Sequence, residues 1–354
     1  ALRRQWYDMV TRKMYITGGL GSRYEGEAFG NAYELPPDQC YCETCAAIGS
    51  IMWNWRMLQA TGEGRFGDII ERTLYNGFLS GLALSGKAFF YINPLLSRDN
   101  YQRQEWYEVA CCPPNIMRLL ASLGQYVATQ DNHGLQIHLY NPATIETELQ
   151  GKRPLAVTMT TEYPWQGGVT LTIRDTDSAS WQLRLRVPDW STNVSVVLNG
   201  QALNDPAVED GYLLFDRVWR RGDVIELDPT LEPQFIEPHP RVDAVRNSIA
   251  IQRGPLVYCL EQIDCQANLM DIQIDSKASL QTSAEEKLLP EPFIAVETSG
   301  SVVDFDDWQD NLYRPLHNNY DFNPGVPIPL TLIPYYAWAN RGATSMRVWI
   351  PRKT

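Results

Sequence analysis

The sequence lacks the long apolar run and the basic surplus that would connect it to a membrane or to nucleic acid. A membrane-spanning helix needs about 20 predominantly apolar residues, and the best candidate stretch, residues 77–92, is broken by Ser80, Ser85, Gly86 and Lys87. Residues 1–14 have no apolar core of the kind that a signal peptide requires. The 42 acidic residues exceed the 30 Lys and Arg, which gives the 354-residue chain a net charge of −12. We therefore expect neither a membrane nor nucleic acid as a partner.

Histidine is also scarce, which weakens one class of catalytic site. The four histidines all lie after residue 130, at His133, His138, His239 and His317. They are distant in sequence from the clustered cysteines described next, so a Cys–His dyad of the protease type has little support. We expect each histidine to be a surface or loop residue.

Cysteine is present in an odd number and is unevenly spaced. Five of the seven fall into two tight clusters, which are Cys40, Cys42 and Cys45, and then Cys111 and Cys112. The other two are Cys259 and Cys265. The disulfide framework of a secreted protein would be paired and more evenly spread. We therefore expect a reducing, cytoplasmic compartment, in which the clusters serve a metal or a reaction.

Helical periodicity dominates up to about residue 129. Apolar residues at helical spacing predict one helix from Thr44 to a stop at Gly62, and a second over residues 66–78. Pro113 and Pro114 mark the first turn of a third helix, which continues to about residue 127. Residues 2–14 also have helical spacing, but no capping residue precedes them. We therefore expect this chain to start inside a larger helical domain.

From residue 130 the period changes to the alternation typical of β-strands. Residues 169–173 and 181–187 alternate in polarity, and Asn199-Gly200 predicts a hairpin turn between strands at 194–198 and 212–215. Residues 267–325 are rich in Asp, Glu, Ser and Pro and are expected to form long loops. Short strands with Gly, Pro and Asn between them favour antiparallel β-sandwiches. The sequence predicts an α+β multidomain fold, with a helical domain at 1–129 and β-sandwiches at 130–235 and 236–354.

Two cysteine motifs, CYCETC at residues 40–45 and ACCPPN at residues 110–115, each precede a predicted helix. Free N–H groups at a helix start favour the thiolate, which is the form of cysteine that binds zinc or attacks carbon. Zn2+ takes four N, S or O ligands. Two ligands from each motif would complete a site, drawn from Cys42, Glu43, Cys45, Cys111 and Cys112.

Three other interpretations remain open from these residues alone. The cysteines could be small buried core residues. A purely structural zinc site could use four thiolates, those of Cys42, Cys45, Cys111 and Cys112. Cys42 and Cys45 could also form a Cys-x-x-Cys redox pair, although no thioredoxin-like βαβ pattern surrounds them.

One acid near the first motif has distinctive neighbours. Glu27 lies in the segment GEAFG, where small and aromatic residues could exclude water. A carboxylic acid in a dry site can donate a proton to a leaving group. The other acids near this motif are expected to be solvated surface charges.

The motifs GEAFGNAYELPPDQCYCETCA, AFFYINPL and VACCPPN together resemble those of glycoside hydrolase family 127, the β-L-arabinofuranosidase family. Similarity continues through DAVRNSIAIQRGPLVYCLE and LTLIPYYAWANRG, so the resemblance covers nearly the whole chain. It implies the C-terminal part of an (α/α)6 barrel followed by antiparallel β-sandwich domains, with Zn2+ beside the catalytic centre. Family members have a long helical portion before the acid/base loop, which this sequence does not include.

The resemblance also implies roles for individual residues. Four residues would be the zinc ligands: Glu43, Cys45, Cys111 and Cys112. Cys111 would also be the nucleophile, and Glu27 would be the acid/base. Tyr91, the tyrosine of FFYINPL, would contact the sugar. Cys42 is an additional thiol beside the ligand pair and could compete with Glu43 for the metal.

These roles imply a retaining, exo-acting β-L-arabinofuranosidase that hydrolyses an oligosaccharide or glycoside. The alternative is a non-catalytic carbohydrate-binding protein in which the zinc–cysteine site is structural. Glu27 discriminates between the two, because a structural site needs no acid. The 11 Trp and 18 Tyr are consistent with either core packing or a sugar cleft. A homodimer is among the assemblies that the sequence allows, and we expect activity to need the absent N-terminal barrel segment.

Overall fold

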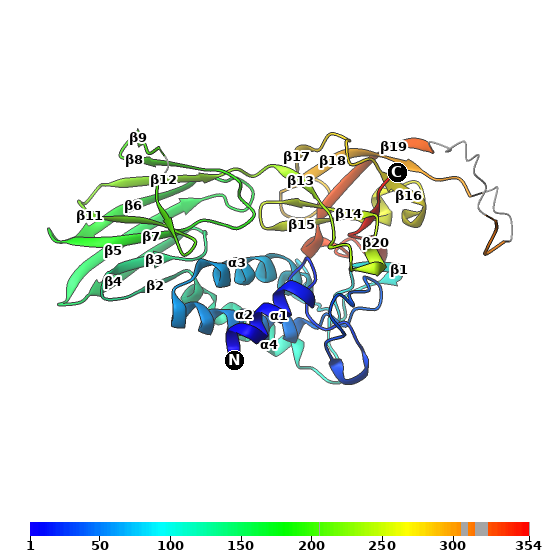
Figure 1. Ribbon diagram of the computed structural model, residues 1–354, viewed down its shortest axis with the longest axis horizontal. Coiled ribbons are helices and arrows are strands. Elements are labelled where there is room, and N and C mark those ends of the chain that lie inside the picture. Colours follow the sequence, from blue (N-terminus) through cyan, green and yellow to red (C-terminus); the bar gives the residue numbers. More distant parts are fainter. Residues whose placement is uncertain (205, 306–310, 316–324, 354) are drawn as a thin grey trace.

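The computed structural model describes residues 1–204, 206–305, 311–315 and 325–353. Figure 1 shows the helices grouped at the lower centre, a pair of sheets on the left and another sheet on the right. The chain passes from the helices to the left-hand sheets and ends in the right-hand sheet. The predicted α+β architecture is confirmed. None of the described helices is long and apolar enough to cross a membrane.

The described part of the helical region contains four α-helices. They are α1 (Leu2–Arg12), α2 (Thr44–Thr61), α3 (Gly64–Thr73) and α4 (Cys112–Ser122). The predicted start and stop of α2 are confirmed, because Gly62 adopts a left-handed φ of 71° and its N–H bonds to the Leu58 carbonyl at 2.7 Å. A π-helical turn, Leu74–Phe78, extends α3. Prolines occupy the first turn of α4 as predicted, but this helix ends at Ser122, earlier than expected.

These helices pack around one apolar core. Ile51 and Leu58 of α2, Phe66 and Ile70 of α3 and Ile116 of α4 are all buried in it. The helices do not close a ring by themselves within the described residues. The (α/α)6 barrel therefore stays a prediction.

The middle region is a sandwich of two sheets with the strand orders β10-β11-β7-β3-β2 and β4-β5-β6-β12-β8-β9. Alternate residues, such as Leu171 and Ile173 of β6 and Leu183 and Leu185 of β7, meet in one core between the sheets. The pairs are antiparallel except for β3 and β7, which run parallel. The strands are β2 (Ala128–Gln130), β3 (Gly134–Ile137), β4 (Ala143–Leu149), β5 (Arg153–Thr161), β6 (Val169–Thr176), β7 (Ser180–Arg186), β8 (Val194–Leu198), β9 (Gln201–Ala202), β10 (Val208–Glu209), β11 (Tyr212–Val218) and β12 (Val224–Pro229).

The hairpin at Asn199-Gly200 is confirmed as a turn, but its predicted partner strand is wrong. Both residues have positive φ values, 50° and 78°, as this type of turn requires. The turn joins β8 to the short strand β9, whereas the expected partner at residues 212–215 belongs to β11 in the facing sheet. A strand as short as β9 has too few residues to show an alternating pattern.

The C-terminal region contains a 10-stranded sheet. Its central strand β15 is buried on both faces, because Val257 and Cys259 pack toward Phe90 of the helical region while Tyr258 and Leu260 pack in a second core. The strands are β1 (Leu96–Tyr101), β13 (Pro233–Ile236), β14 (Ser248–Arg253), β15 (Leu256–Glu261), β16 (Ile272–Ile274), β17 (Gln281–Glu285), β18 (Phe293–Val302), β19 (Val326–Pro334), β20 (Thr344–Arg347) and β21 (Ile350–Pro351).

Two features of this sheet differ from the sequence prediction. Residues 267–325 were expected to be loops, but they include the strands β16, β17 and β18. In β16 and β18 the apolar residues are buried or half-buried. Residues 306–310 and 316–324 of that stretch lie outside the described residues. Strand β1 was not predicted; it comes from the helical region and pairs with β20.

A buried ion-pair group joins the helical region to the middle sandwich. Arg186 of β7 is fully buried and bonds to Asp68 and Glu71 of α3. We call Asp68, Glu71 and Arg186 the junction cluster. The carbonyl of His138 accepts a hydrogen bond from Arg186 Nε at 2.6 Å. His138 lies in the loop that follows β3, as the prediction allowed, but it is buried and is not a surface residue.

Candidate active site

The candidate active site lies where the N-terminal ends of α2 and α4 meet. Glu43 immediately precedes α2, and Cys45 lies in the first turn of that helix. Cys111 immediately precedes α4, and Cys112 is its first residue. Helix–helix contact between α2 and α4 therefore brings the two cysteine motifs together from distant parts of the sequence.

The structure gathers the four residues that the resemblance implied as ligands. Cys45 Sγ lies 3.5 Å from Cys112 Sγ, which is 3.7 Å from Cys111 Sγ. Glu43 Oε1 lies 3.3 Å from Cys111 Sγ and 3.6 Å from Cys112 Sγ. One potential ligand atom of each residue lies within 4.8 Å of all the others. We call Glu43, Cys45, Cys111 and Cys112 the cysteine cluster.

The cysteine cluster has the chemistry and the spacing of a metal site. Three sulfurs and one carboxylate oxygen are donors that Zn2+ accepts, and a tetrahedron with bonds of about 2.3 Å has sulfur–sulfur edges of about 3.8 Å. The measured sulfur–sulfur separations of 3.5 and 3.7 Å are close to that edge. All four groups are anionic when they ionise, so a cation is needed to keep them ionised together. The residues present therefore fit a zinc ion.

The thiols of the cluster shift one another's pKa. The contact with Cys112 lowers the pKa of Cys45 to about 7, and a hydrogen bond from Asn115 contributes to the same shift. The same contact is the largest cause that raises the pKa of Cys112, and burial raises the pKa of Cys111. The opposite shifts of Cys45 and Cys112 mean that Cys45 is the thiol of this pair that ionises at the lower pH. A divalent cation would favour the thiolate form of all three residues.

Tyr91 lies beside the cysteine cluster. Its hydroxyl is 3.4 Å from Cys111 Sγ, and this contact is the main cause that raises the pKa of Tyr91. The backbone of Tyr91 is fixed on both sides, because its carbonyl accepts from the Thr44 N–H at 3.0 Å and its N–H donates to the Tyr107 hydroxyl at 3.1 Å. Tyr107 in turn donates to the Phe89 carbonyl at 2.8 Å. The segment before β1 is therefore anchored to the start of α2.

The sequence did not indicate Asn115 and Tyr107, which both support this arrangement. The Asn115 amide donates to Cys45 Sγ at 3.1 Å, and Arg118 Nη1 fixes its other end through Asn115 Oδ1 at 2.8 Å. Asn115 is the last residue of ACCPPN, so its place one turn into α4 was available as a signal. Tyr107 lies outside any motif, and its role depends on a contact across the fold.

Glu27 lies in a short 3-10 turn, Glu25–Glu27, on the loop between α1 and α2. The Tyr41 hydroxyl, on a largely buried side chain, donates to Glu27 Oε1 at 2.8 Å. Glu27 itself is exposed, and so is its neighbour Phe29, so the expected exclusion of water by GEAFG is wrong for this chain. The alternation of small and aromatic residues does not reveal which of them face solvent.

A cavity of about 300 Å³ extends from Glu27 to Glu43, one member of the cysteine cluster. Glu27 and Glu43 both line it, and Phe29, Tyr41 and Trp53 add aromatic walls. A cavity of this size with an aromatic lining and two carboxyl groups has the character of a small-ligand site.

Cys42, the competing thiol, lies outside the cysteine cluster. It is 1% exposed and packs in the core between the helical region and the C-terminal sheet, together with Cys40 and Phe90. Burial raises its pKa well above the ordinary value of a thiol. In the described residues Glu43, and not Cys42, completes the donor group.

The described histidines take no part in the cluster, which contains only one carboxylate and three thiols. His133 and His239 are exposed, as expected. His317 lies outside the described residues. All seven cysteines are free thiols, so Cys42 and Cys45 are not joined as a disulfide.

Three family models match consecutive parts of the chain. The GH127 catalytic domain of β-L-arabinofuranosidase matches residues 1–125, the GH127 middle domain matches 134–231, and the glycoside hydrolase family 127 C-terminal domain matches 233–351. A non-reducing end β-L-arabinofuranosidase of Bifidobacterium longum subsp. longum is 34% identical over 98% of this chain and 54% of its own length.

Solved structures give the same result. A GH127 β-L-arabinofuranosidase from Geobacillus stearothermophilus T6 aligns with a TM-score of 0.91 and 39% identity, over 98% of this chain and 56% of that one. A GH127 β-arabinofuranosidase aligns with a TM-score of 0.90 and 35% identity, over 100% of this chain and 56% of that one. This chain thus spans about half the length of these relatives. The chain belongs to glycoside hydrolase family 127.

Proposed function

We propose that this chain supplies the nucleophile and the acid/base of a retaining, exo-acting β-L-arabinofuranosidase that acts on an oligosaccharide or glycoside. The observation that supports the proposal is the cavity that Glu27 shares with Glu43, a member of the cysteine cluster. A retaining mechanism requires a nucleophile and an acid/base, and we assign these roles to Cys111 of the cluster and to Glu27. The names of the relatives supply the sugar.

In the first step, the Cys111 thiolate attacks the anomeric carbon of the sugar. The new carbon–sulfur bond forms as the bond to the leaving oxygen breaks, and that oxygen takes the proton of Glu27. The Tyr41 hydroxyl occupies one carboxyl oxygen of Glu27, which leaves the other oxygen to carry the proton. Tyr91, beside Cys111, would contact the sugar as it reacts.

In the second step, water attacks the same carbon, and Glu27, now a carboxylate, takes a proton from that water. The carbon–sulfur bond breaks and its electron pair returns to Cys111. Two successive inversions at one carbon retain its configuration.

Zinc is the metal that we propose for the cysteine cluster. Glu43, Cys45, Cys111 and Cys112 would hold it. A bound Zn2+ keeps coordinated thiols deprotonated at neutral pH. The Asn115 amide would orient Cys45 through the hydrogen bond to its sulfur.

We also propose that full activity needs the additional length found in the relatives. Apolar side chains are exposed on the very segments that carry the site: Phe29 near Glu27, then Trp106, Val109 and Met117 around Cys111. Contiguous exposed apolar residues mark surfaces that other polypeptide covers. Under this proposal, the chemistry belongs to residues 1–129, while the segments 130–235 and 236–354 form supporting β-sandwich domains.

The non-catalytic alternative predicts a closed structural site. Cys45 and Cys111 are only half-buried, and the cavity reaches Glu43. A structural zinc site is closed by four protein ligands and needs no acid opposite them. These observations favour the catalytic proposal.

The test is Glu27→Gln in a protein that includes the additional N-terminal length. We expect turnover of a β-L-arabinofuranosyl disaccharide to fall by about 10²–10⁴-fold, the usual contribution of a general acid. Zinc content should not change. Glu25→Gln, in the same exposed turn, is the matched control and should retain wild-type turnover. Wild-type rates in Glu27→Gln would assign the acid role to another residue.

A further inference from the structure

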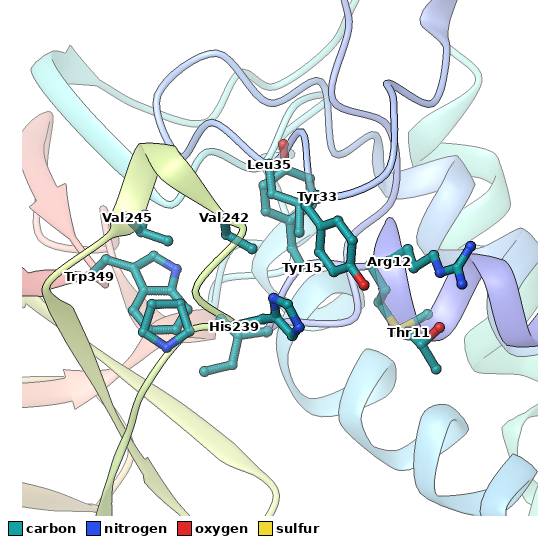
Figure 2. Close-up of a pocket in the computed structure, with 12 residues that line it drawn as sticks. Thr11, Arg12, Tyr15, Tyr33, Leu35, His239, Val242, Val245 and Trp349 are labelled. Carbon is teal, nitrogen blue, oxygen red and sulfur yellow. The ribbon is translucent and has the colours of Figure 1, made fainter.

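A second cavity, of about 150 Å³, shares none of its lining residues with the candidate active site. It lies between the end of α1, the loop that leads from Glu27 to α2, and the turn that follows β13. Figure 2 shows its walls, which come from segments far apart in the sequence: Thr11 and Arg12, Tyr33, His239, Val242 and Trp349.

The cavity has an apolar floor and a polar rim. Met14, Val242 and Val245 are buried beneath it. The rim contains the Arg12 guanidinium and the ring nitrogens of His239. The Arg241 N–H donates to His239 Nδ1 at 3.1 Å, which assigns the proton of a neutral ring to Nε2 and makes that atom a donor.

Tyr33 forms one aromatic wall through an unusual backbone conformation. Its φ is 69°, in the left-handed region that non-glycine residues rarely adopt. Its N–H donates to the Arg12 carbonyl at 2.8 Å, which ties the loop to the end of α1. The ring stacks on His239 with centroids 4.6 Å apart, and the Arg241 guanidinium lies 5.5 Å from its centre. Strain of this kind persists where the surroundings hold it, and it concentrates at functional sites.

We propose that this cavity binds one sugar ring of a glycan as a non-catalytic subsite. An apolar cavity of about 150 Å³ accommodates a single six-membered ring. A sugar presents an apolar C–H face, which suits the floor and the aromatic walls, and a ring of hydroxyls, which suits the donors of the rim. Arg12 is the only formally charged residue among the described lining residues, and its guanidinium pairs with Asp8 at 3.3 Å, so the lining has little net charge and suits a neutral sugar. This subsite goes beyond the proposed catalytic function and needs neither Glu27 nor the cysteine cluster.

Hydroxyl-radical footprinting read by mass spectrometry tests the subsite, with L-arabinose and D-galactose as probes. At saturating sugar, oxidation of Trp349 and Tyr33 should fall by about threefold, because a pocket covers most of the ligand and the ligand covers its walls. Tyr313, which is 89% exposed and does not line the cavity, is the control and should be unaffected.

Two variants locate the effect. Tyr33→Gly should fold normally, since glycine adopts positive φ without strain, and should abolish the protection of Trp349. Trp349→Leu keeps an apolar wall and should weaken the protection of Tyr33. The proposal is overturned if neither sugar protects Trp349 and Tyr33, or if Tyr33→Gly leaves the protection of Trp349 intact. Protection of Tyr41 and Phe29 reports the candidate active site separately, so either site can fail without the other.

Discussion

The cysteine cluster and the junction cluster both gather acidic groups at helices of the same region, but they differ in how charge is compensated. In the junction cluster, two carboxylates of α3 share Arg186, a guanidinium that the chain itself provides. In the cysteine cluster, one carboxylate and three thiols lie within 4.8 Å and include no cation. The first group is complete within the chain, whereas the proposed zinc ion would supply the cation of the second.

The two clusters also differ in their exposure to solvent. Arg186 is fully buried and Glu71 nearly so, which seals the junction between α3 and β7. Cys45 and Cys111 are half-buried and can be reached from solvent. An acidic group that carries its own cation and is closed to solvent supports the fold, and one that lacks a cation and stays open can bind a ligand or react. The following predictions test this distinction, from the largest expected effect to the smallest.

Cys111→Ser should lower kcat/KM for a β-L-arabinofuranoside by about a thousandfold or more, because a hydroxyl ionises far less than a thiol. The assay uses protein with the additional length found in the relatives, and zinc content is measured alongside. Cys265→Ser, at a half-buried thiol outside the cluster, should leave kcat/KM unchanged. Normal turnover in Cys111→Ser would exclude this residue as the nucleophile.

Arg186→Met should lower the free energy of unfolding by about 3–5 kcal/mol, because two buried carboxylates lose their partner. Urea denaturation followed by circular dichroism measures the change. Arg153→Met breaks the half-exposed pair with Asp177 and should cost at most about 1 kcal/mol. Similar losses in the two variants would mean that burial does not separate the junction cluster from an ordinary surface pair.

Removing metal should destabilise the protein through the cysteine cluster. A ligand at a hundredfold excess over its Kd contributes about 2.7 kcal/mol, so EDTA should lower the melting temperature of metal-loaded protein in calorimetry. Cys112→Ala should lose most of this response, whereas Arg186→Met should keep it. An undiminished EDTA effect in Cys112→Ala would place the metal elsewhere.

Thiol reactivity should reveal the lowered pKa of Cys45 once metal is removed. Because that pKa is about 7, the thiolate prevails above it, and alkylation by iodoacetamide should rise about tenfold between about pH 6 and about pH 8. Burial raises the pKa of Cys265 to about 11, so this thiol should stay largely unreactive over that range. Peptide mass spectrometry distinguishes the two sites, and added Zn2+ should suppress the reaction at Cys45. A Cys45 profile that follows that of Cys265 would contradict the lowered pKa of Cys45.

Features that depend on neighbouring residues in the sequence could be predicted. The start and stop of α2 follow from Gly62 and the apolar spacing, and both cysteine motifs could be placed at helix starts before their distances were known. Contacts that cross the fold could not be anticipated. The hydrogen bond from Tyr41 to Glu27 and the one from Tyr107 to Phe89 depend on where loops meet, and the sequence has no periodic pattern for that.

Strands were missed where their length or composition hid the alternation. Strand β9 has two residues, and β17 is polar at most positions, so neither shows a clear period of two. The expectation that Glu27 is shielded from water was also wrong, since neighbouring residue types do not define which side of a loop faces water.

Strand β1 has a consequence for how this protein can be divided. It lies in the sequence between Tyr91 and Cys111, yet it pairs with β20 near the other end of the chain. Arg103, just after β1, is buried and donates to the carbonyls of Tyr336 and Trp338. The C-terminal sheet therefore holds the segment that connects Tyr91 to Cys111, the proposed sugar contact and nucleophile. The three regions are separate stretches of sequence, but they are not structurally independent. Removing or exchanging the last region would therefore also disturb the candidate active site.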